Sequence, residues 1–111
     1  MKKLTATGIV LGTPEFMSPE QVRGKDIDAR SDVYSLGILG FEMFTGKLPF
    51  EGRSAQEMMI ARLRGSAIPL RKHRPDLPAQ LEKALAKSME ANPDNRYASA
   101  KEFGAALADL L

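Results

Sequence analysis

Residues 31–45 read SDVYSLGILGFEMFT, and this stretch decides the fold. At about 100° per residue, its large apolar side chains cover nearly the whole circumference of a helix. Such a helix is either buried at the centre of a domain or crosses a membrane. A membrane span needs about 20 apolar residues, whereas this run is interrupted by Glu42 and closes at Gly46. The stretch therefore predicts a buried central helix that other elements surround. Its large apolar residues are Val33, Tyr34, Leu36, Ile38, Leu39, Phe41, Met43 and Phe44.

The residues at both ends of this stretch support a helix. Ser31 is a favourable N-cap, and Asp28 and Asp32 complement the positive end of the helix dipole. Gly46 is a natural C-cap, with Pro49 just beyond it. The β-branched and aromatic content would also permit a buried strand, but the length and the caps favour a helix.

Composition places only loose bounds on function. A length of 111 residues predicts one domain with a modest core. The net charge of +2 is spread over interleaved acids and bases, which argues against a nucleic-acid partner. The absence of cysteine excludes disulfides, cysteine-ligated zinc and a thiol nucleophile. Met1-Lys2-Lys3 is not followed by the apolar segment of a signal peptide, so we expect a cytoplasmic chain without a membrane segment.

The rest of the chain predicts helices separated by turns, and no strand. Residues 1–18 are expected to form a loop, and Ala67 to Pro78, with three prolines, an irregular segment. Serines precede three further helices: Ser18 before residues 19–23, Ser54 before a helix ending near residue 64, and Ser99 before the last helix. Glu57 is the expected capping-box partner of Ser54. A helix over residues 79–89 presents Leu81, Ala84, Leu85 and Ser88 on one side. The predicted fold class is all-α.

Three short motifs imitate catalytic or phosphate-binding sequences. Residues 73–76, HRPD, resemble an H-R-D catalytic loop, but a proline splits the motif. Residues 102–104, EFG, resemble a metal-binding D-F-G, but they fall in a predicted helix. The glycines at 40 and 46 are spaced wrongly for a phosphate loop, and Leu48 replaces its hydroxyl residue. We predict no catalytic or metal role for these residues.

Three other segments, in consistent order and spacing, carry a resemblance to the protein kinases. Residues 12–20, GTPEFMSPE, look like the end of a kinase activation segment, with Ser18-Pro19-Glu20 in place of A-P-E. Residues 32–37, DVYSLG, are similar to the start of the family's central helix, and residues 46–50, GKLPF, follow it. Residues 92–97, NPDNRY, match the loop between its last helices. The resemblance covers essentially all 111 residues and is strongest to bacterial, eukaryotic-like Ser/Thr kinases.

The resemblance implies the helical C-terminal lobe of a kinase, without the β-rich N-terminal lobe and the catalytic loop. Residues 1–18 would be an activation-segment remnant, and residues 19–111 a helical subdomain. Kinase chemistry needs a Gly-rich loop, a strand lysine, a catalytic aspartate and a metal-holding aspartate, and these motifs are not among the 111 residues. We therefore expect no cofactor in this chain, although a complete parent kinase would use ATP and Mg²⁺, and we predict that the chain is inactive by itself.

The resemblance also assigns roles near the start of the chain. Gly12 and Thr13 would help form the pocket for the substrate residue that follows the phosphorylated hydroxyl, although Thr13 also reads as an ordinary turn residue. Thr5 and Thr7 fall where such kinases are phosphorylated, although a solvated Thr-rich terminus explains them equally well.

Other roles implied by the resemblance are structural. Glu20 and Arg96 would form a buried ion pair. In the family, Asp32 accepts hydrogen bonds from the catalytic loop; here we expect it to cap its own helix. Residues 54–64 correspond to a helix that docks substrates and regulators, although its methionine pair is more typical of a core.

Three functional hypotheses remain open. The chain is a truncated piece of a Ser/Thr kinase, a protein-interaction module that docks kinase partners, or half of a split kinase that a second chain completes. Because the family covers its central helix partly with the catalytic loop, we expect exposed apolar residues on this helix and, as a result, self-association. Some of five residues are expected to be uncovered: Val33, Tyr34, Leu36, Ile38 and Phe41. Folding of residues 4–11 over the helix is the alternative.

Overall fold

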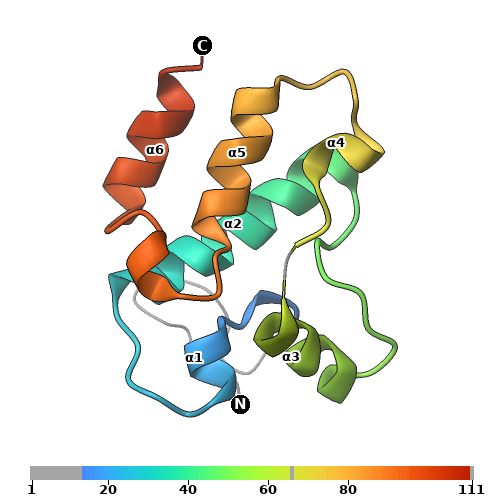
Figure 1. Cartoon of the computed structure of the whole chain (residues 1–111), viewed down its shortest axis with the longest axis vertical. Helices are drawn as coiled ribbons and strands as arrows, with labels where there is room; N and C mark the ends of the chain where they lie inside the picture. The colour runs from blue at the N-terminus through green and yellow to red at the C-terminus, as the bar shows by residue number, and fades with distance from the viewer. Residues whose placement is uncertain (1–13, 66, 111) are drawn as a thin grey trace.

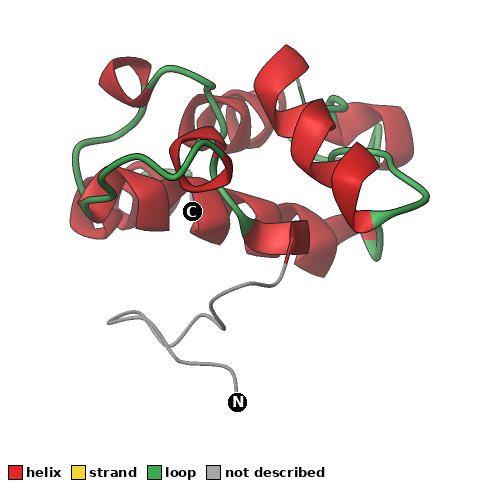
Figure 2. Cartoon of the chain, turned by 90° about the horizontal axis from the view of Figure 1, so that it is seen from below, coloured by secondary structure: helices red, strands yellow, loops and turns green. Residues whose placement is uncertain are grey.

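The computed structural model describes residues 14–65 and 67–110 of the chain, and all regular structure within these ranges is helical (Figures 1 and 2). The all-α prediction is thus confirmed for the described residues. The elements in chain order are η1 (Pro14–Phe16), α1 (Pro19–Val22), α2 (Ala29–Thr45), α3 (Ala55–Arg64), α4 (Leu70–His73), α5 (Ala79–Ser88), η2 (Pro93–Asn95) and α6 (Ala100–Ala108). Within the same ranges, no helix is long and apolar enough to cross a membrane.

Helix α2 is the centre of the fold. In Figure 1 it passes behind α5, and α5 and α6 lie side by side on it. The helix also packs against α4 and η1. Tyr34 stacks on Phe50 with ring centroids 6.1 Å apart, and the His73 ring meets Phe41 edge-on. The core is made of Val33, Tyr34, Ile38, Phe41, Phe50, Leu70, Leu81, Leu85, Met89 and Phe103.

Helix α2 begins at Ala29, and its N-cap is Asp28, three residues before the predicted N-cap Ser31. The Asp28 backbone is extended, and its carboxylate accepts from the Arg30 amide at 2.8 Å. The prediction that Ser31 or Asp32 caps the helix is therefore wrong, because both lie inside the helix. Gly46 is the C-cap as predicted, in the left-handed conformation with φ of 71° that favours glycine.

The expected exposure on α2 is also wrong. Val33, Tyr34, Ile38 and Phe41 are 0% exposed, and Leu36 is half-buried, because the surrounding helices and the Phe50 ring cover them. The exposed large side chains of the helix are instead Leu39 at 39%, Met43 at 77% and Phe44 at 38%. The helix is thus central but not buried on every side.

Helices α2 and α5 approach each other closely at Gly37. A β-carbon at this position would lie 2.0 Å from the Ser88 hydroxyl oxygen. Ser88 is fully buried, and its hydroxyl donates to the Leu85 carbonyl at 2.6 Å. The contact therefore requires glycine on α2 and a small, internally bonded residue on α5.

The other predicted helices are present with small differences. Helix α5 buries Leu81, Ala84, Leu85 and Ser88, the face predicted for it. Ser54 and Ser99 cap their helices by accepting from the amides three residues on. Glu57 does not complete a capping box on Ser54, because its carboxylate accepts from the Arg53 amide instead.

Two short elements were not predicted. Helix α4 forms inside the proline-containing segment because Pro69 supplies an extended N-cap and Leu70 is buried against the core. The 3-10 turn η1 falls in a segment that we expected to be loop.

Candidate functional site

The segment from Glu15 to Glu20 is held by residues from three other parts of the chain, and this arrangement is the candidate site. Its last part is built by a capping box around Ser18. The Ser18 amide donates to the Gln21 side chain at 2.8 Å, and the Ser18 hydroxyl accepts from the Gln21 amide at 3.4 Å. Pro19 occupies the first helical position, where no amide hydrogen is needed. This capping box starts α1, in which the Glu20 side chain lies buried in the protein.

Glu20 forms a buried, two-pronged ion pair with Arg96. The Arg96 Nη1 and Nη2 atoms donate to the two Glu20 carboxylate oxygens at 2.6 and 2.8 Å. Ser31 adds a hydroxyl donor to the Glu20 Oε2 atom at 2.7 Å. Both charged residues are under 10% exposed. The structure thus brings together two residues 76 positions apart that the resemblance to the kinases paired.

Arg96 is further bonded on its remaining donors. It donates to the carbonyls of Glu90, Arg30 and Ala91 at 2.7, 3.0 and 3.2 Å. Its guanidinium also lies 4.7 Å from the Tyr34 ring centre, as a cation–π contact. Arg96 therefore ties α1, the start of α2 and the loop after α5 to one point.

The surroundings of Glu20 keep it ionised. Burial alone raises its pKa, but hydrogen bonds from Arg96 and Ser31 together outweigh burial, and the net pKa lies below the ordinary value. The ion pair is therefore charged at neutral pH.

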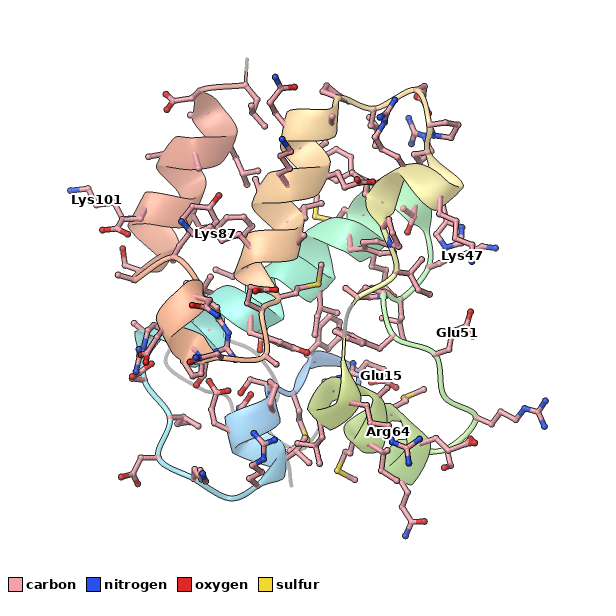
Figure 3. The ribbon with its side chains drawn as sticks, in the orientation of Figure 1. Glu15, Lys47, Glu51, Arg64, Lys87 and Lys101 are labelled. Atoms are coloured by element: carbon pink, nitrogen blue, oxygen red, sulfur yellow. The ribbon has the colours of Figure 1, made fainter. Side chains whose placement is uncertain are left out.

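A second arginine, Arg62 of α3, is buried at the other end of the segment and is 0% exposed. It donates to the carbonyls of Met17 at 3.2 Å and Met58 at 2.7 Å, and also to the Glu15 carbonyl. Its guanidinium lies 4.9 Å from the Phe50 ring centre. Burial lowers the pKa of Arg62. Figure 3 shows Glu15 beside α3, the helix that carries Arg62 and the labelled Arg64.

The Tyr34 ring lies in the core against the first of these arginines, Arg96. It stacks on the Phe50 ring and lies under the Arg96 guanidinium. Its hydroxyl is buried without a hydrogen-bond partner in the described part of the chain. Burial raises the Tyr34 pKa well above its ordinary value, so the phenol is neutral.

The remaining predicted site residues fall into two groups. Gly12, Thr13, Thr5 and Thr7 lie outside the described residues. Asp32 lies in the first turn of α2 and is not its N-cap.

The catalytic look-alikes have structural roles. Arg74 and Asp76 of the HRPD motif form an ion pair with each other at 2.8 Å, on the surface. In the EFG motif, Phe103 is buried in α6, within the core. Among the described residues, no group of three or more histidines, aspartates or glutamates is arranged to hold a metal ion.

Sequence reasoning missed the roles of Arg62, Ser31 and Ser35. Ser35 donates its hydroxyl to the Phe16 carbonyl at 2.5 Å. Arg62 looks like a surface residue because it lies in the charged last turn of an amphipathic helix. The available signal was its position four residues after Met58, which places it on the inward face of α3.

Known proteins resemble the chain over nearly its full length. Residues 1–105 match the family model described as Protein kinase domain. Serine/threonine-protein kinase PknB of Mycolicibacterium smegmatis is 41% identical over 104 residues, which are 94% of the chain and 17% of that protein. Tyrosine-protein kinase MasK of Myxococcus xanthus is 41% identical over 107 residues, which are 96% of the chain and 17% of that protein.

A solved structure shows the same fold. The twitchin kinase region from C. elegans superposes with a TM-score of 0.73 at 23% identity, covering 87% of the chain and 16% of that structure. The chain thus spans 17% of the length of the two kinases above, and its described part is helical like their shared family's C-terminal lobe. The chain belongs to the protein kinase domain family.

Proposed function

We propose that the chain is the C-terminal-lobe portion of a Ser/Thr protein kinase, which transfers phosphate from ATP to serine or threonine in proteins. The Glu20–Arg96 ion pair carries this proposal, because it joins two kinase-like motifs that lie 76 residues apart in sequence. The similarity to a kinase described as Ser/Thr-specific supports the substrate class. The chain would act in the cytoplasm.

The part of the reaction assigned to this portion is the binding of the protein substrate. Gly12 and Thr13 would line the pocket for the residue after the phosphorylated hydroxyl, and Thr5 and Thr7 would be phosphorylation sites in the activation loop. Phosphoryl transfer depends on positioned phosphate and metal ligands, and their motifs are not among the 111 residues. ATP and Mg²⁺ would therefore be bound by the rest of a complete kinase.

This proposal predicts that the purified chain neither binds ATP·Mg²⁺ nor phosphorylates a protein. The tests are calorimetric titration with the nucleotide and transfer of radiolabelled phosphate to a protein substrate. A longer protein that contains this stretch within a complete domain is the positive control and should transfer phosphate. Saturable micromolar binding by the 111-residue chain would contradict its inactivity, and an inactive complete protein would contradict the kinase assignment.

An interaction module is the second candidate, and one observation favours it. Apolar side chains are exposed on two helices: Leu39, Met43 and Phe44 on α2, and Ile60 at 46% on α3. Such a module would bind protein partners, including kinases, substrates or a second copy of itself. A split kinase is a variant of this idea, in which the partner supplies the nucleotide-binding half. Mixing the chain with a kinase N-terminal half and assaying phosphate transfer tests this variant.

A further inference from the structure

The backbone carbonyls of Glu15, Phe16 and Met17 each accept a hydrogen bond from a side chain of another helix. Arg62 of α3 donates to the carbonyls of Glu15 and Met17. Ser35 of α2 donates to the Phe16 carbonyl between them, at 2.5 Å. Three consecutive carbonyls are thus fixed by two side chains, which we call the carbonyl clamp.

The chemistry of Arg62 shows what the clamp is suited for. A buried guanidinium is costly to remove from water, and burial lowers its pKa. In the part of the chain that the structure describes, its hydrogen bonds go to carbonyl oxygens of Glu15, Met17 and Met58. An apolar side chain would fill the space but would leave the carbonyls unpaired, whereas a planar guanidinium reaches several acceptors at once. The arginine therefore serves to hold the segment as well as to fill the core.

Ser35 is suited to the same task by its position. It lies inside α2 and is 3% exposed, so water cannot easily bond its hydroxyl. That hydroxyl donates to the Phe16 carbonyl instead. The two clamp residues come from two different helices, and η1 packs against both of them, α2 and α3. A segment bonded to both helices cannot move away from either one without breaking hydrogen bonds.

We propose that Arg62, together with Ser35, is a positioning residue for the peptide-binding loop of the kinase. This inference rests on the proposed function, in which Gly12 and Thr13 contact the protein substrate. Glu15 follows Thr13 by two residues, so the clamp fixes the described backbone that comes directly after Gly12 and Thr13 in the sequence. The clamp residues touch neither ATP nor the transferred phosphate and act only through the loop.

Limited proteolysis of the 111-residue chain tests the clamp without any activity. Chymotrypsin cuts after phenylalanine, so cleavage at Phe16 reports opening of the clamped segment, and cleavage at Phe103 in α6 reports opening of the core. Loss of one or two hydrogen bonds should raise the rate of cleavage at Phe16 by about tenfold. We expect this rise in Ser35→Ala and a larger one in Arg62→Met, with the Phe103 rate unchanged in Ser35→Ala.

Matched variants separate local from global effects. Arg64→Met, on the same helix but exposed, should leave both cleavage rates unchanged, and Arg62→Lys, which keeps the charge but loses the fork of donors, should fall between the parent and Arg62→Met. If Arg62→Met unfolds the chain, cleavage at Phe16 and at Phe103 will rise together. The cleavage rates of Ser35→Ala and Arg62→Lys then test the clamp. Equal rises at Phe16 and Phe103 in these two milder variants, or no rise at Phe16, would overturn the clamp.

The kinetic consequence is tested in the longer protein that contains the complete domain. In Ser35→Ala, the KM for a peptide substrate should rise several-fold, while kcat and the KM for ATP stay within about twofold, because the loop binds the peptide and not the nucleotide. A fall in kcat with an unchanged peptide KM would overturn the positioning role. An inactive parent protein would refute the proposed function instead, while the proteolysis result would still judge the clamp.

Discussion

Two arginine–carboxylate pairs of this chain have the same chemistry but differ in depth. Arg96 and Glu20 are buried, with side chains 0% and 10% exposed, whereas Arg74 and Asp76 are 41% and 62% exposed. Breaking a buried pair leaves an uncompensated charge without water, at a cost of about 3–5 kcal/mol. Solvent screens an exposed pair, so its loss changes little.

Glu20→Gln is therefore expected to lower the free energy of unfolding by about 3–5 kcal/mol, out of the roughly 5–15 kcal/mol typical of a domain. Arg96→Met should act in the same direction, and either variant should unfold at a lower urea concentration than the parent. Urea unfolding followed by circular dichroism measures the effect. Asp76→Asn is the matched control and should keep the parent's midpoint. Similar midpoints for Glu20→Gln and Asp76→Asn would show that the buried pair contributes no more to the free energy of unfolding than the exposed pair.

The lowered pKa of Glu20 predicts an acid-sensitive fold. A carboxylate whose pKa is lower in the folded state stabilises the protein above its unfolded pKa, about 4.3 for glutamate. That stabilisation is lost as the pH falls from there through the folded pKa. The melting temperature of the parent should thus drop between about pH 5 and pH 3 more steeply than that of Glu20→Gln. Asp28 and Asp76 also have lowered pKa values, so only the difference between the two curves reports Glu20. Parallel curves would contradict the assignment.

At the scale of elements, the contact of α2 with α5 depends on the missing side chain of Gly37. Gly37→Ala would place a methyl group 2.0 Å from the Ser88 hydroxyl oxygen and 3.0 Å from the Ser88 β-carbon. Overpacking of this kind costs about 1–3 kcal/mol, so thermal unfolding should show a clearly lower midpoint. Ser88→Ala added to Gly37→Ala should recover only part of the loss, because the β-carbon of residue 88 remains.

Gly104 in α6 is the control for that substitution. A β-carbon there would meet no atom within 4 Å beyond its chain neighbours and its own helix backbone, and alanine is favoured over glycine in a helix by about 0.5–1 kcal/mol. Gly104→Ala should therefore raise the thermal midpoint. A loss of stability in Gly104→Ala would mean that this glycine has a role beyond the helix.

The helical face of α5 was predictable because it is amphipathic, so its burial follows from its own spacing. The start of α2 was not, because Asp28 and Ser31 are both good N-caps. In the structure, the Ser31 hydroxyl donates to the Glu20 carboxylate of α1 at 2.7 Å and does not cap α2, so Asp28 is the N-cap. The exposed side of α2 was mispredicted for a similar reason: periodicity finds apolar residues but does not say which neighbours cover them.

One part of the candidate site was likewise predicted before the structure, and another part was missed. Glu20 and Arg96 were paired from the resemblance of two motifs, and the structure places their side chains 2.6 Å apart. Arg62 was missed because the composition of α3 indicates a solvated last turn, and the acceptors of Arg62 are backbone carbonyls, which leave no mark in a sequence.

For the whole molecule, the exposed apolar side chains predict self-association. Leu39, Met43 and Phe44 are on one helix, and Met43 is 77% exposed. Light scattering at tens of micromolar should give a mass above the 12.2 kDa of one chain, and Met43→Lys should return it toward that value. Gln56→Lys, at an exposed polar position of α3, is the matched control and should leave the association unchanged. A monodisperse monomer for the parent chain would refute this prediction.

The Glu20–Arg96 pair also affects how the chain is made. Arg96 leaves the ribosome 76 residues after Glu20, which at about 5–20 residues per second takes roughly 4–15 s. Throughout this time the carboxylate has no guanidinium partner, and an unpaired buried charge is unfavourable. We therefore expect α1 to remain undocked until Arg96 has left the ribosome. A ribosome that stalls before this codon leaves α1 undocked and accessible to chaperones and proteases.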